Sequence, residues 1–330
     1  MKISLETTPI YQLMIAGSGA WSRNSFVQSN NWSYCLNPVI LNEIDNAVQE
    51  VRRNAKTLHN VMEKSFFISS FKEAAIKVLQ ELKTGCGFVV LQGLPAEKYT
   101  DDEICMVYWS LSHFLGIRLV QNLQEDRLYS VFDKGYSQDD LASKSGVRGT
   151  QTRAPLDLHT DSAPLFRNQS VDVVAMFVLR PAKSGGDSLL ISAQALHNII
   201  LEKFPKLLER LYQPYYFDRR AELQPGESPI TLLAPIFSYQ DYLRIRYSKI
   251  RILKGYEAEG LPIDSSVTES IEMLESVIQQ NHLIMNLQLN RGEMLLVNNH
   301  FVLHGRTAFE DDLHPEKKRH LMRIWLSFNP

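Results

Sequence analysis

The chain has 330 residues, of which 44% are hydrophobic, so it is long enough to bury a large core. Its 35 basic and 37 acidic side chains nearly cancel, which argues against a nucleic acid or an anionic membrane surface as partner. The first residues lack a signal-peptide pattern, and no apolar run reaches the roughly 18 residues of a membrane span. These features predict a soluble cytoplasmic protein with a small-molecule substrate.

Cysteine usage agrees with a reducing compartment. Cys35, Cys86 and Cys105 are widely separated and form no CxxC pair. The sequence therefore indicates neither a disulfide framework nor a thiolate zinc site.

The first 85 residues are expected to be mostly helical, although residues 1–40 show no sustained periodicity. Apolar residues spaced by three and four from Ile44 to Met62 predict an amphipathic helix after a cap at Asn42. A second such pattern runs from Phe71 to Leu82 and ends at Gly85.

Short strands and Gly-marked turns dominate residues 86–330. Strands are expected at 88–91, 171–179, 189–191, 283–289, 294–297 and 321–328, and a stretch of short strands and loops is expected from Gly116 to about Gly149. Helices are expected at 101–115 and, as insertions into the strands, at about 193–211 (after a cap at Ser192) and 266–280. Residues 224–229 are interpreted as a linker or an excursion of the chain, and 242–252 as an extended hairpin.

This succession predicts a mainly β fold with α additions. We expect a double-stranded β-helix (jelly-roll) core flanked by helices, in a single domain spanning residues 1–330.

His159 and Asp161 stand two residues apart on a locally extended segment, so their side chains point to one face. An imidazole and a carboxylate so placed can hold two adjacent positions of a divalent metal, and a second histidine would complete a facial triad. His304, which follows a buried strand, is the candidate, with His300 as the alternative. On local pattern alone, a hydrogen-bonded core histidine is the favoured interpretation of His159, and the features described next reverse that order.

A second histidine–acid pair, His314 and Glu316, has the same spacing. It lies in a run of charged residues with a proline between the two side chains, which is typical of a solvated loop.

Two arginines and a serine suggest an anion site. Arg319 and Arg323 share one side of the terminal strand, and Ser188 follows a Gly-Gly turn, where its hydroxyl could add a hydrogen bond to a bound carboxylate. The structural alternatives are a place in the charged run for Arg319, a core ion pair for Arg323 and a turn role for Ser188.

These motifs resemble the taurine dioxygenase and clavaminate synthase group of iron(II)- and 2-oxoglutarate-dependent oxygenases, from roughly Cys86 to the end. The resemblance rests on Leu158-His159-Thr160-Asp161, Gly185-Gly186-Asp187-Ser188, Asn299 through Leu303-His304-Gly305-Arg306-Thr307-Ala308-Phe309, and Arg319-His320-Leu321-Met322-Arg323.

The resemblance implies a role for each of these residues. His159, Asp161 and His304 would bind Fe(II), and Arg319 with Ser188 would bind the far carboxylate of 2-oxoglutarate. Arg323 would lie nearer the iron, against the other end of this cosubstrate or the substrate. Asp161 favours oxygenation over halogenation, because halogenating relatives have a small residue there.

The implied reaction hydroxylates an unactivated C–H bond of a small polar metabolite, a free amino acid or a derivative, while 2-oxoglutarate and O2 become succinate and CO2. Desaturation, epoxidation or cyclisation are alternatives with the same cofactors. A zinc hydrolase and a non-catalytic metal-binding or ligand-sensing jelly roll are alternatives of other classes, but neither needs the arginine pair. The oligomeric state is open. Candidate substrate-binding residues are Gln121, Asn122, Arg153, Arg220 and Arg306.

Overall fold

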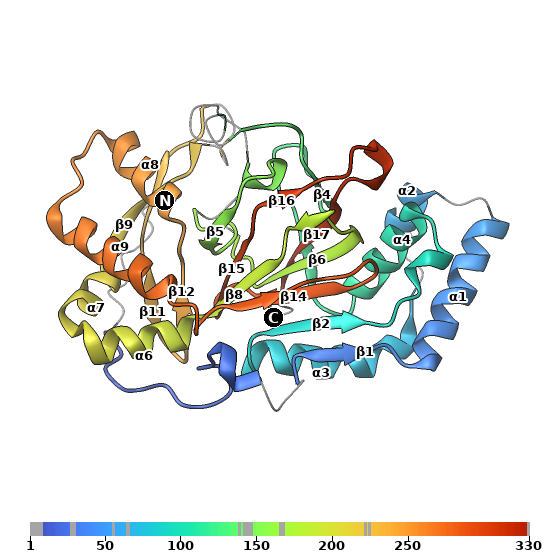
Figure 1. Cartoon of the computed structure of the whole chain (residues 1–330), viewed down its shortest axis with the longest axis horizontal. Helices are drawn as coiled ribbons and strands as arrows, with labels where there is room; N and C mark the ends of the chain where they lie inside the picture. Colours follow the sequence, from blue (N-terminus) through green and yellow to red (C-terminus); the bar gives the residue numbers. More distant parts are fainter. Residues whose placement is uncertain are drawn as a thin grey trace.

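The computed structural model describes residues 9–328, apart from residues 27–30, 55–56, 64–66, 138–139, 141–147, 165–168, 221–222 and 224–225. In this part of the chain, two β-sheets lie at the centre of the molecule and helices gather at both ends (Figure 1). The predicted mainly β fold with helical additions is confirmed. None of the described helices has both the length and the apolar character needed to cross a bilayer.

The larger sheet has seven strands, and only the β1–β2 pair in it is parallel. In spatial order, the strands are β1 (Ser33–Cys35), β2 (Phe88–Gln92), β14 (Met294–Asn298), β6 (Val173–Arg180), β17 (His320–Ser327) and β3 (Ile117–Leu119). The seventh strand, β4 (Tyr129–Val131), pairs with β17. The central strands β14 and β6 are buried at almost every position because other elements cover both faces of the sheet.

The smaller sheet has four antiparallel strands. In spatial order they are β13 (Met285–Leu287), β8 (Ser188–Ser192), β15 (Val302–Arg306) and β5 (Leu156–His159). Next to them, β7 (Ser184–Gly185) pairs with β16 (Phe309–Glu310). Leu190 and Val302 from this sheet pack against Phe88, Val90 and Val297 of the larger sheet, so the two sheets face each other.

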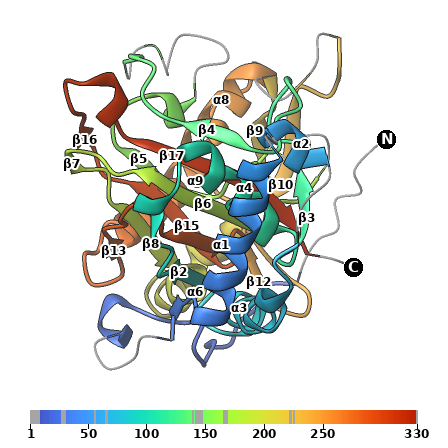
Figure 2. The same cartoon turned by 90° about the vertical axis from the view of Figure 1, so that its right-hand side faces the viewer.

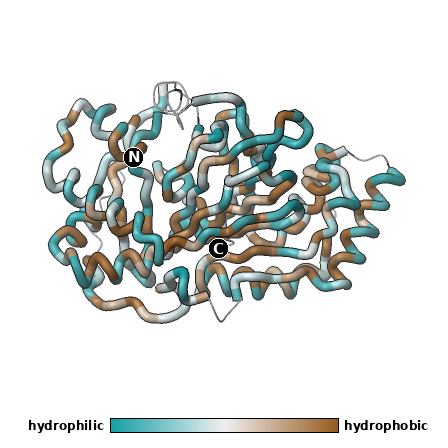
Figure 3. The backbone as a smooth tube through the Cα atoms, viewed as in Figure 1, coloured by the Kyte–Doolittle hydropathy of each residue, from teal (hydrophilic) through white to brown (hydrophobic). Residues whose placement is uncertain are grey.

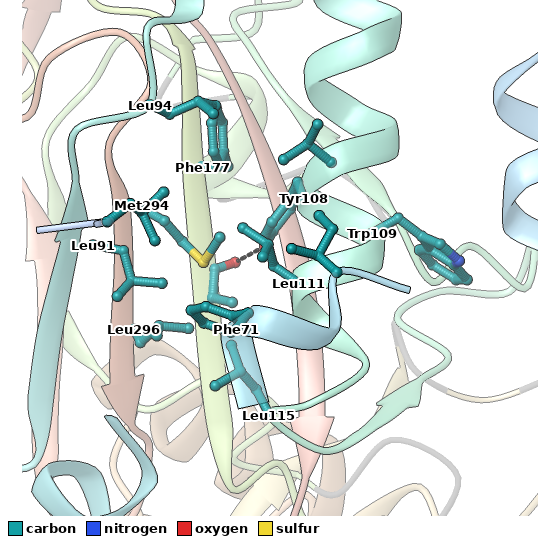
Figure 4. Close-up of a cluster of buried hydrophobic side chains, with 14 of the residues drawn as sticks. Phe71, Leu91, Leu94, Tyr108, Trp109, Leu111, Leu115, Phe177, Met294 and Leu296 are labelled. Carbon is teal, nitrogen blue, oxygen red and sulfur yellow. Dashed lines mark hydrogen bonds between the residues drawn. The ribbon is translucent and has the colours of Figure 1, made fainter. Parts of the chain in front are cut away.

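Helices of the first half cover the other face of the larger sheet (Figure 2). They are α1 (Pro38–Arg53), α2 (Leu58–Glu63), α3 (Lys72–Thr84) and α4 (Asp101–Ser112). Between them and the sheet lies a cluster that includes Phe71, Phe177 and Leu296 (Figure 4). Within it, Tyr108 of α4 donates its hydroxyl to the carbonyl of Ala175 on β6 at 2.8 Å, which satisfies a fully buried hydroxyl.

A second helical group occupies the opposite end of the molecule (Figures 1 and 3). It contains α6 (Ala193–Lys203), α7 (Pro205–Leu211), α8 (Lys249–Glu259) and α9 (Ser265–Ile278), with the strand pairs β9 (Pro214–Asp218) with β10 (Thr231–Pro235) and β11 (Phe237–Tyr239) with β12 (Leu243–Ile245). A second apolar cluster joins these elements, and Leu158 and Leu303 link it to the smaller sheet. The two predicted helical insertions therefore lie in this group.

Local capping signals predicted the start of α6 and the end of α3 correctly and the start of the first long helix wrongly. Ser192 caps α6 by accepting from the Ala195 amide at 3.0 Å, and α3 ends at Gly85. The first long helix begins at Pro38 instead of after Asn42, because Asn37 accepts from the Ile40 amide at 3.0 Å and proline suits the first helical turn. It also ends at Arg53, and α2 is a separate helix.

The expected hairpin over residues 242–252 is wrong in its second half. β12 ends at Ile245, and α8 begins at Lys249. Ile252 and Tyr256 are four residues apart and both are buried, which is a helical spacing. The predicted linker at 224–229 lies partly outside the described residues.

Candidate metal centre

His159 and His304 lie directly opposite each other on neighbouring strands. They are paired positions of β5 and β15, and their ring centroids are 4.6 Å apart. Asp161 follows β5 in a turn whose position is fixed by its neighbour: Thr160 donates its amide to the Tyr247 carbonyl at 2.7 Å and accepts the Tyr247 amide at 3.0 Å. The strand pairing and this turn bring the three side chains together.

The three side chains form a compact set of potential metal ligands. Oδ1 of Asp161 lies 3.3 Å from Nε2 of His159 and 3.7 Å from Nε2 of His304. One ligand atom from each residue lies within 4.8 Å of the others. Two imidazoles and one carboxylate are the donor set of a facial triad, which suits non-haem iron(II).

Neighbouring groups orient the ligand atoms of the triad. Oδ2 of Asp161 accepts from Nη1 of Arg323 at 3.0 Å and from Nε1 of Trp325 at 2.7 Å, so Oδ1 is left facing the histidines. Nδ1 of His159 donates to the Asp157 carbonyl at 2.8 Å, which leaves Nε2 as the lone-pair nitrogen. The backbone of Asp161 is held too, because Asn299 accepts its amide and donates to its carbonyl.

The protonation states suit a cation. Burial opposes ionisation of Asp161, but Arg323 and the two histidines hold the pKa of this carboxyl well below its usual range. Burial lowers the pKa of His304, against the pull of Asp161, and so favours the neutral imidazole that a metal needs. The triad therefore fits an iron(II) ion in the charge and in the type of its donor atoms.

The triad opens into a cavity between the two sheets. Alternating residues of the larger sheet, Val174, Met176, Leu295, Val297 and Leu321, form an apolar wall. The smaller sheet contributes Leu156, Ser188, His304 and Arg306. Thr150, Arg319 and Arg323 also line this space. A largely apolar pocket with a few convergent polar groups is typical of a small-molecule site.

Arg319 is a buried guanidinium inside this cavity, with 4% of its surface exposed. Nη1 has no hydrogen-bond partner among the described residues, and no described carboxylate pairs with the side chain. Burial and the nearby Arg306 lower the pKa of Arg319 to about 9, which still leaves it charged at neutral pH. A charge in this position demands an anion. Ser188 lines the same cavity, on the strand next to Arg306.

Arg323 has two roles in the geometry. Nη1 pairs with Asp161, and Nε donates to Oε1 of Gln121 at 2.8 Å. Nη2 has no partner within the described residues, so one donor remains for a molecule in the cavity. The observed role of Arg323 is its ion pair with the carboxylate of Asp161, and its cofactor-binding role stays a prediction.

The proposed substrate residues are spread out. Gln121 is fully buried and holds Arg323, while Asn122 bonds Asp126 in a loop. Arg153 pairs with Asp133, and Arg220 pairs with Asp218 at the end of β9. Of the five candidates only Arg306 lines the cavity described above. The substrate roles of the other four stay predictions.

The competing histidines are placed elsewhere. His300 bonds Oδ1 of Asp172 at 2.8 Å and lies outside the triad. His314 and Glu316 are exposed, with about two thirds of each side chain accessible.

Sequence reasoning missed Trp325 and Thr150. Trp325 follows Arg323 by two positions on β17, so the alternation that paired the arginines also places its side chain on the site face. Thr150 lies in a short 3-10 helix (Gly149–Gln151) that precedes β5, and no sequence pattern indicated it.

Comparison with known proteins agrees with this geometry. Residues 55–325 match the model of the family described as taurine catabolism dioxygenase TauD, TfdA family. The predicted enzyme class, a 2-oxoglutarate-dependent non-haem iron dioxygenase, is confirmed. The chain belongs to the TauD, TfdA family. The match begins before Cys86, so the family similarity extends further toward the N-terminus than the motifs alone indicated.

Individual relatives cover nearly the whole chain. FR-33289 synthase from Streptomyces rubellomurinus (strain ATCC 31215) is 29% identical over 321 residues, which are 95% of this chain and 90% of that protein. Asparagine oxygenase, solved with Fe(II), 3-hydroxyasparagine and succinate, superposes with a TM-score of 0.65 at 14% identity over 89% of this chain and 93% of that one. The iron oxygenase OrfP, solved with Fe and alpha-ketoglutaric acid, gives 0.65 at 14% identity over 90% and 94%. The chain shares their fold.

Proposed function

We propose that this protein hydroxylates an unactivated C–H bond of a free amino acid or an amino-acid derivative. Fe(II) would be held by His159, Asp161 and His304, and 2-oxoglutarate by Arg319 and Ser188, with Arg323 nearer the metal. The observation that carries the proposal is the buried Arg319, which has no carboxylate partner in the described chain and lines the same cavity as the triad. A dicarboxylate that also binds the metal would neutralise it.

The substrate class is supported by the ligands of two proteins that share the fold and by one polar donor in the cavity. Asparagine oxygenase and OrfP were solved with hydroxylated asparagine and hydroxylated arginine, respectively. The free Nη2 of Arg323 offers a donor for a carboxylate close to the triad.

When bound, iron(II) with 2-oxoglutarate and O2 supplies the oxidising chemistry, which releases succinate and CO2. The chain's own residues position and shield. Arg319 and Ser188 orient the cosubstrate, Trp325 and Arg323 hold Asp161, and the apolar wall of Val174, Met176 and Leu295 limits the access of water. Asp161 occupies the position of the third protein ligand, and this favours hydroxylation over halogenation.

The fold proposal is a jelly-roll core in one oxygenase domain over residues 1–330, with the helical groups as additions. Two facing antiparallel sheets with the site between them support it. We also propose a cytoplasmic location and no nucleic-acid partner, on the balanced charge of the chain.

Anaerobic addition of Fe(II) and then 2-oxoglutarate tests the proposal. We expect a metal-to-ligand charge-transfer band that needs both components, and no such band in the His304→Ala variant. Failure of the band in properly loaded wild-type protein would overturn the proposal.

The substrate can be found through succinate formation. Amino acids and related metabolites that stimulate succinate release are then examined for their products. A gain of one oxygen atom supports hydroxylation, whereas a loss of two hydrogens would favour desaturation or cyclisation with the same cofactors.

A further inference from the structure

Arg306 lies at the same part of the cavity as Ser188. It is two residues from His304 on β15, so both side chains lie on one face of the smaller sheet. It is also the paired position of Ser188 on β8. Two residues along a strand span about 7 Å, a distance that a five-carbon dicarboxylate can bridge from the triad.

Arg306 and Arg319 form a pair of neighbouring guanidinium groups. Both lie against the ring of Phe309, with Cζ 4.7 Å and 5.0 Å from its centroid. Arg306 is close enough to lower the pKa of Arg319, and burial lowers its own pKa to about 10. Both residues are about 95% buried. Asp311 acts on both guanidinium groups and Asp133 on Arg306, and each raises the pKa that burial lowers, but no described carboxylate forms an ion pair with either arginine. Two like charges held together away from water are costly without an anion.

The polar groups around this pair are incompletely satisfied. Nη2 of Arg306 donates to the carbonyls of Thr152 and Ala154, but Nε has no partner in the described part of the chain. The segment that receives these bonds follows Thr150, whose hydroxyl is likewise buried without a described partner. Thr150 lines the cavity together with Arg306 and Arg319. Buried donors of this kind normally meet an acceptor.

We infer that Thr150 and Arg306 bind the far carboxylate of 2-oxoglutarate together with Arg319 and Ser188. This inference rests on the proposed function and moves Arg306 from the substrate to the cosubstrate. The carboxylate would lie between two guanidinium groups and accept from two hydroxyls, which satisfies donors that the protein alone leaves unpaired.

Binding measurements on matched variants test this inference. Fe(II)-loaded protein is titrated anaerobically with 2-oxoglutarate and, separately, with pyruvate, a 2-oxo acid that lacks the far carboxylate. Thr150→Val keeps the side-chain volume but removes the hydroxyl. It should weaken the binding of 2-oxoglutarate by about tenfold, as expected for the loss of a hydrogen bond to a charged group, and leave the binding of pyruvate unchanged. Thr150→Ser keeps the hydroxyl and should bind both ligands like the wild type.

Arg306→Gln is the second test variant. It should weaken the binding of 2-oxoglutarate more than Thr150→Val does, because it removes a charge, and again it should have little effect on the binding of pyruvate. Thermal unfolding identifies any variant that fails to fold. In that case the 2-oxoglutarate affinity of the variant at the other position tests the inference. Unchanged 2-oxoglutarate affinity in the folded variants would overturn the inference, as would an equal loss for both ligands, which would indicate a structural role. A wild-type protein with no charge-transfer band would instead refute the proposed function.

Discussion

Trp325 donates its indole N–H to the same carboxylate oxygen of Asp161 that pairs with Arg323. Two side chains of one strand thus donate hydrogen bonds to one oxygen of Asp161, and the other oxygen is left for the metal. Groups that orient a ligand commonly contribute a factor of about 10 to 100 to metal affinity.

Trp325→Phe should therefore weaken Fe(II) binding by roughly 10-fold or more. The change keeps the aromatic ring and removes only the donor. Trp109→Phe is the matched control, because Nε1 of Trp109 is buried without a partner in the described chain. Anaerobic Fe(II) titration measures the effect, and equal affinities in the two variants would contradict the orienting role.

Arg319→Ala should weaken 2-oxoglutarate by roughly 100-fold or more, since a bidentate charged contact is lost, while Fe(II) affinity stays unchanged. The free energy of unfolding of the ligand-free protein should not fall, because a buried charge without a described carboxylate partner is removed. Calorimetric titration and denaturant unfolding provide the two readouts. Arg52→Ala, which breaks an ion pair with Glu103, is a control that should leave both affinities unaltered. Parallel losses of iron and cosubstrate binding would rule out the assignment.

Gly186→Ala should also impair cosubstrate binding. Gly186 has φ +75°, and an added Cβ would lie 3.0 Å from Nε of Arg319, so the guanidinium would be displaced. Gly260→Ala is the control for backbone strain, since its φ is +66° and a Cβ there meets no atom within 4 Å. Both variants should lose about 1 kcal/mol of stability, but only Gly186→Ala should bind 2-oxoglutarate more weakly. The same affinity in both would exclude this displacement of Arg319.

His197 should make the fold sensitive to acid. Burial lowers its pKa from 6.5 to about 4, and its ring bonds the Tyr212 hydroxyl at 2.8 Å. Between these values the unfolded chain binds more protons, so stability falls as the pH drops from about 6.5 towards 4, by up to about 3 kcal/mol. Urea unfolding at pH 7 and pH 4.5 should show a smaller pH dependence for His197→Phe. The exposed His314→Asn should retain the wild-type dependence. An unchanged slope in His197→Phe would refute this source of acid sensitivity.

The sequence predicted the site where spacing within one segment fixes geometry. Asp161 follows His159 by two positions and Arg323 follows Arg319 by four, and each pair does face one cavity, although Asp161 lies in the turn after β5. The same rule could have included Trp325. Gln121 could not be interpreted this way, because its partner Arg323 is 202 positions away and no local pattern encodes such a contact.

The errors in the fold have local causes. Asn37 and Pro38 carry a clear helix-start signal. The regular apolar spacing that predicts the helix begins at Ile44, although Ile40 is equally buried. Over residues 242–252, alternating Arg244 and Arg246 indicated an extended chain. Burial of Ile252 and Tyr256 against the neighbouring strands instead favours a helix from Lys249.

The course of β17 has a consequence for homologous chains. Arg323 and Trp325 lie on this strand, and Arg319 immediately precedes it. The number of residues between the two arginines therefore sets how far Arg319 lies from the triad along the cavity. Insertion or deletion of one residue would turn every later side chain of the strand to the opposite face. Members of this family that use the same cosubstrate should thus accept substitutions between these arginines but no change in length, and a gap there would mark a chain that has lost the reaction.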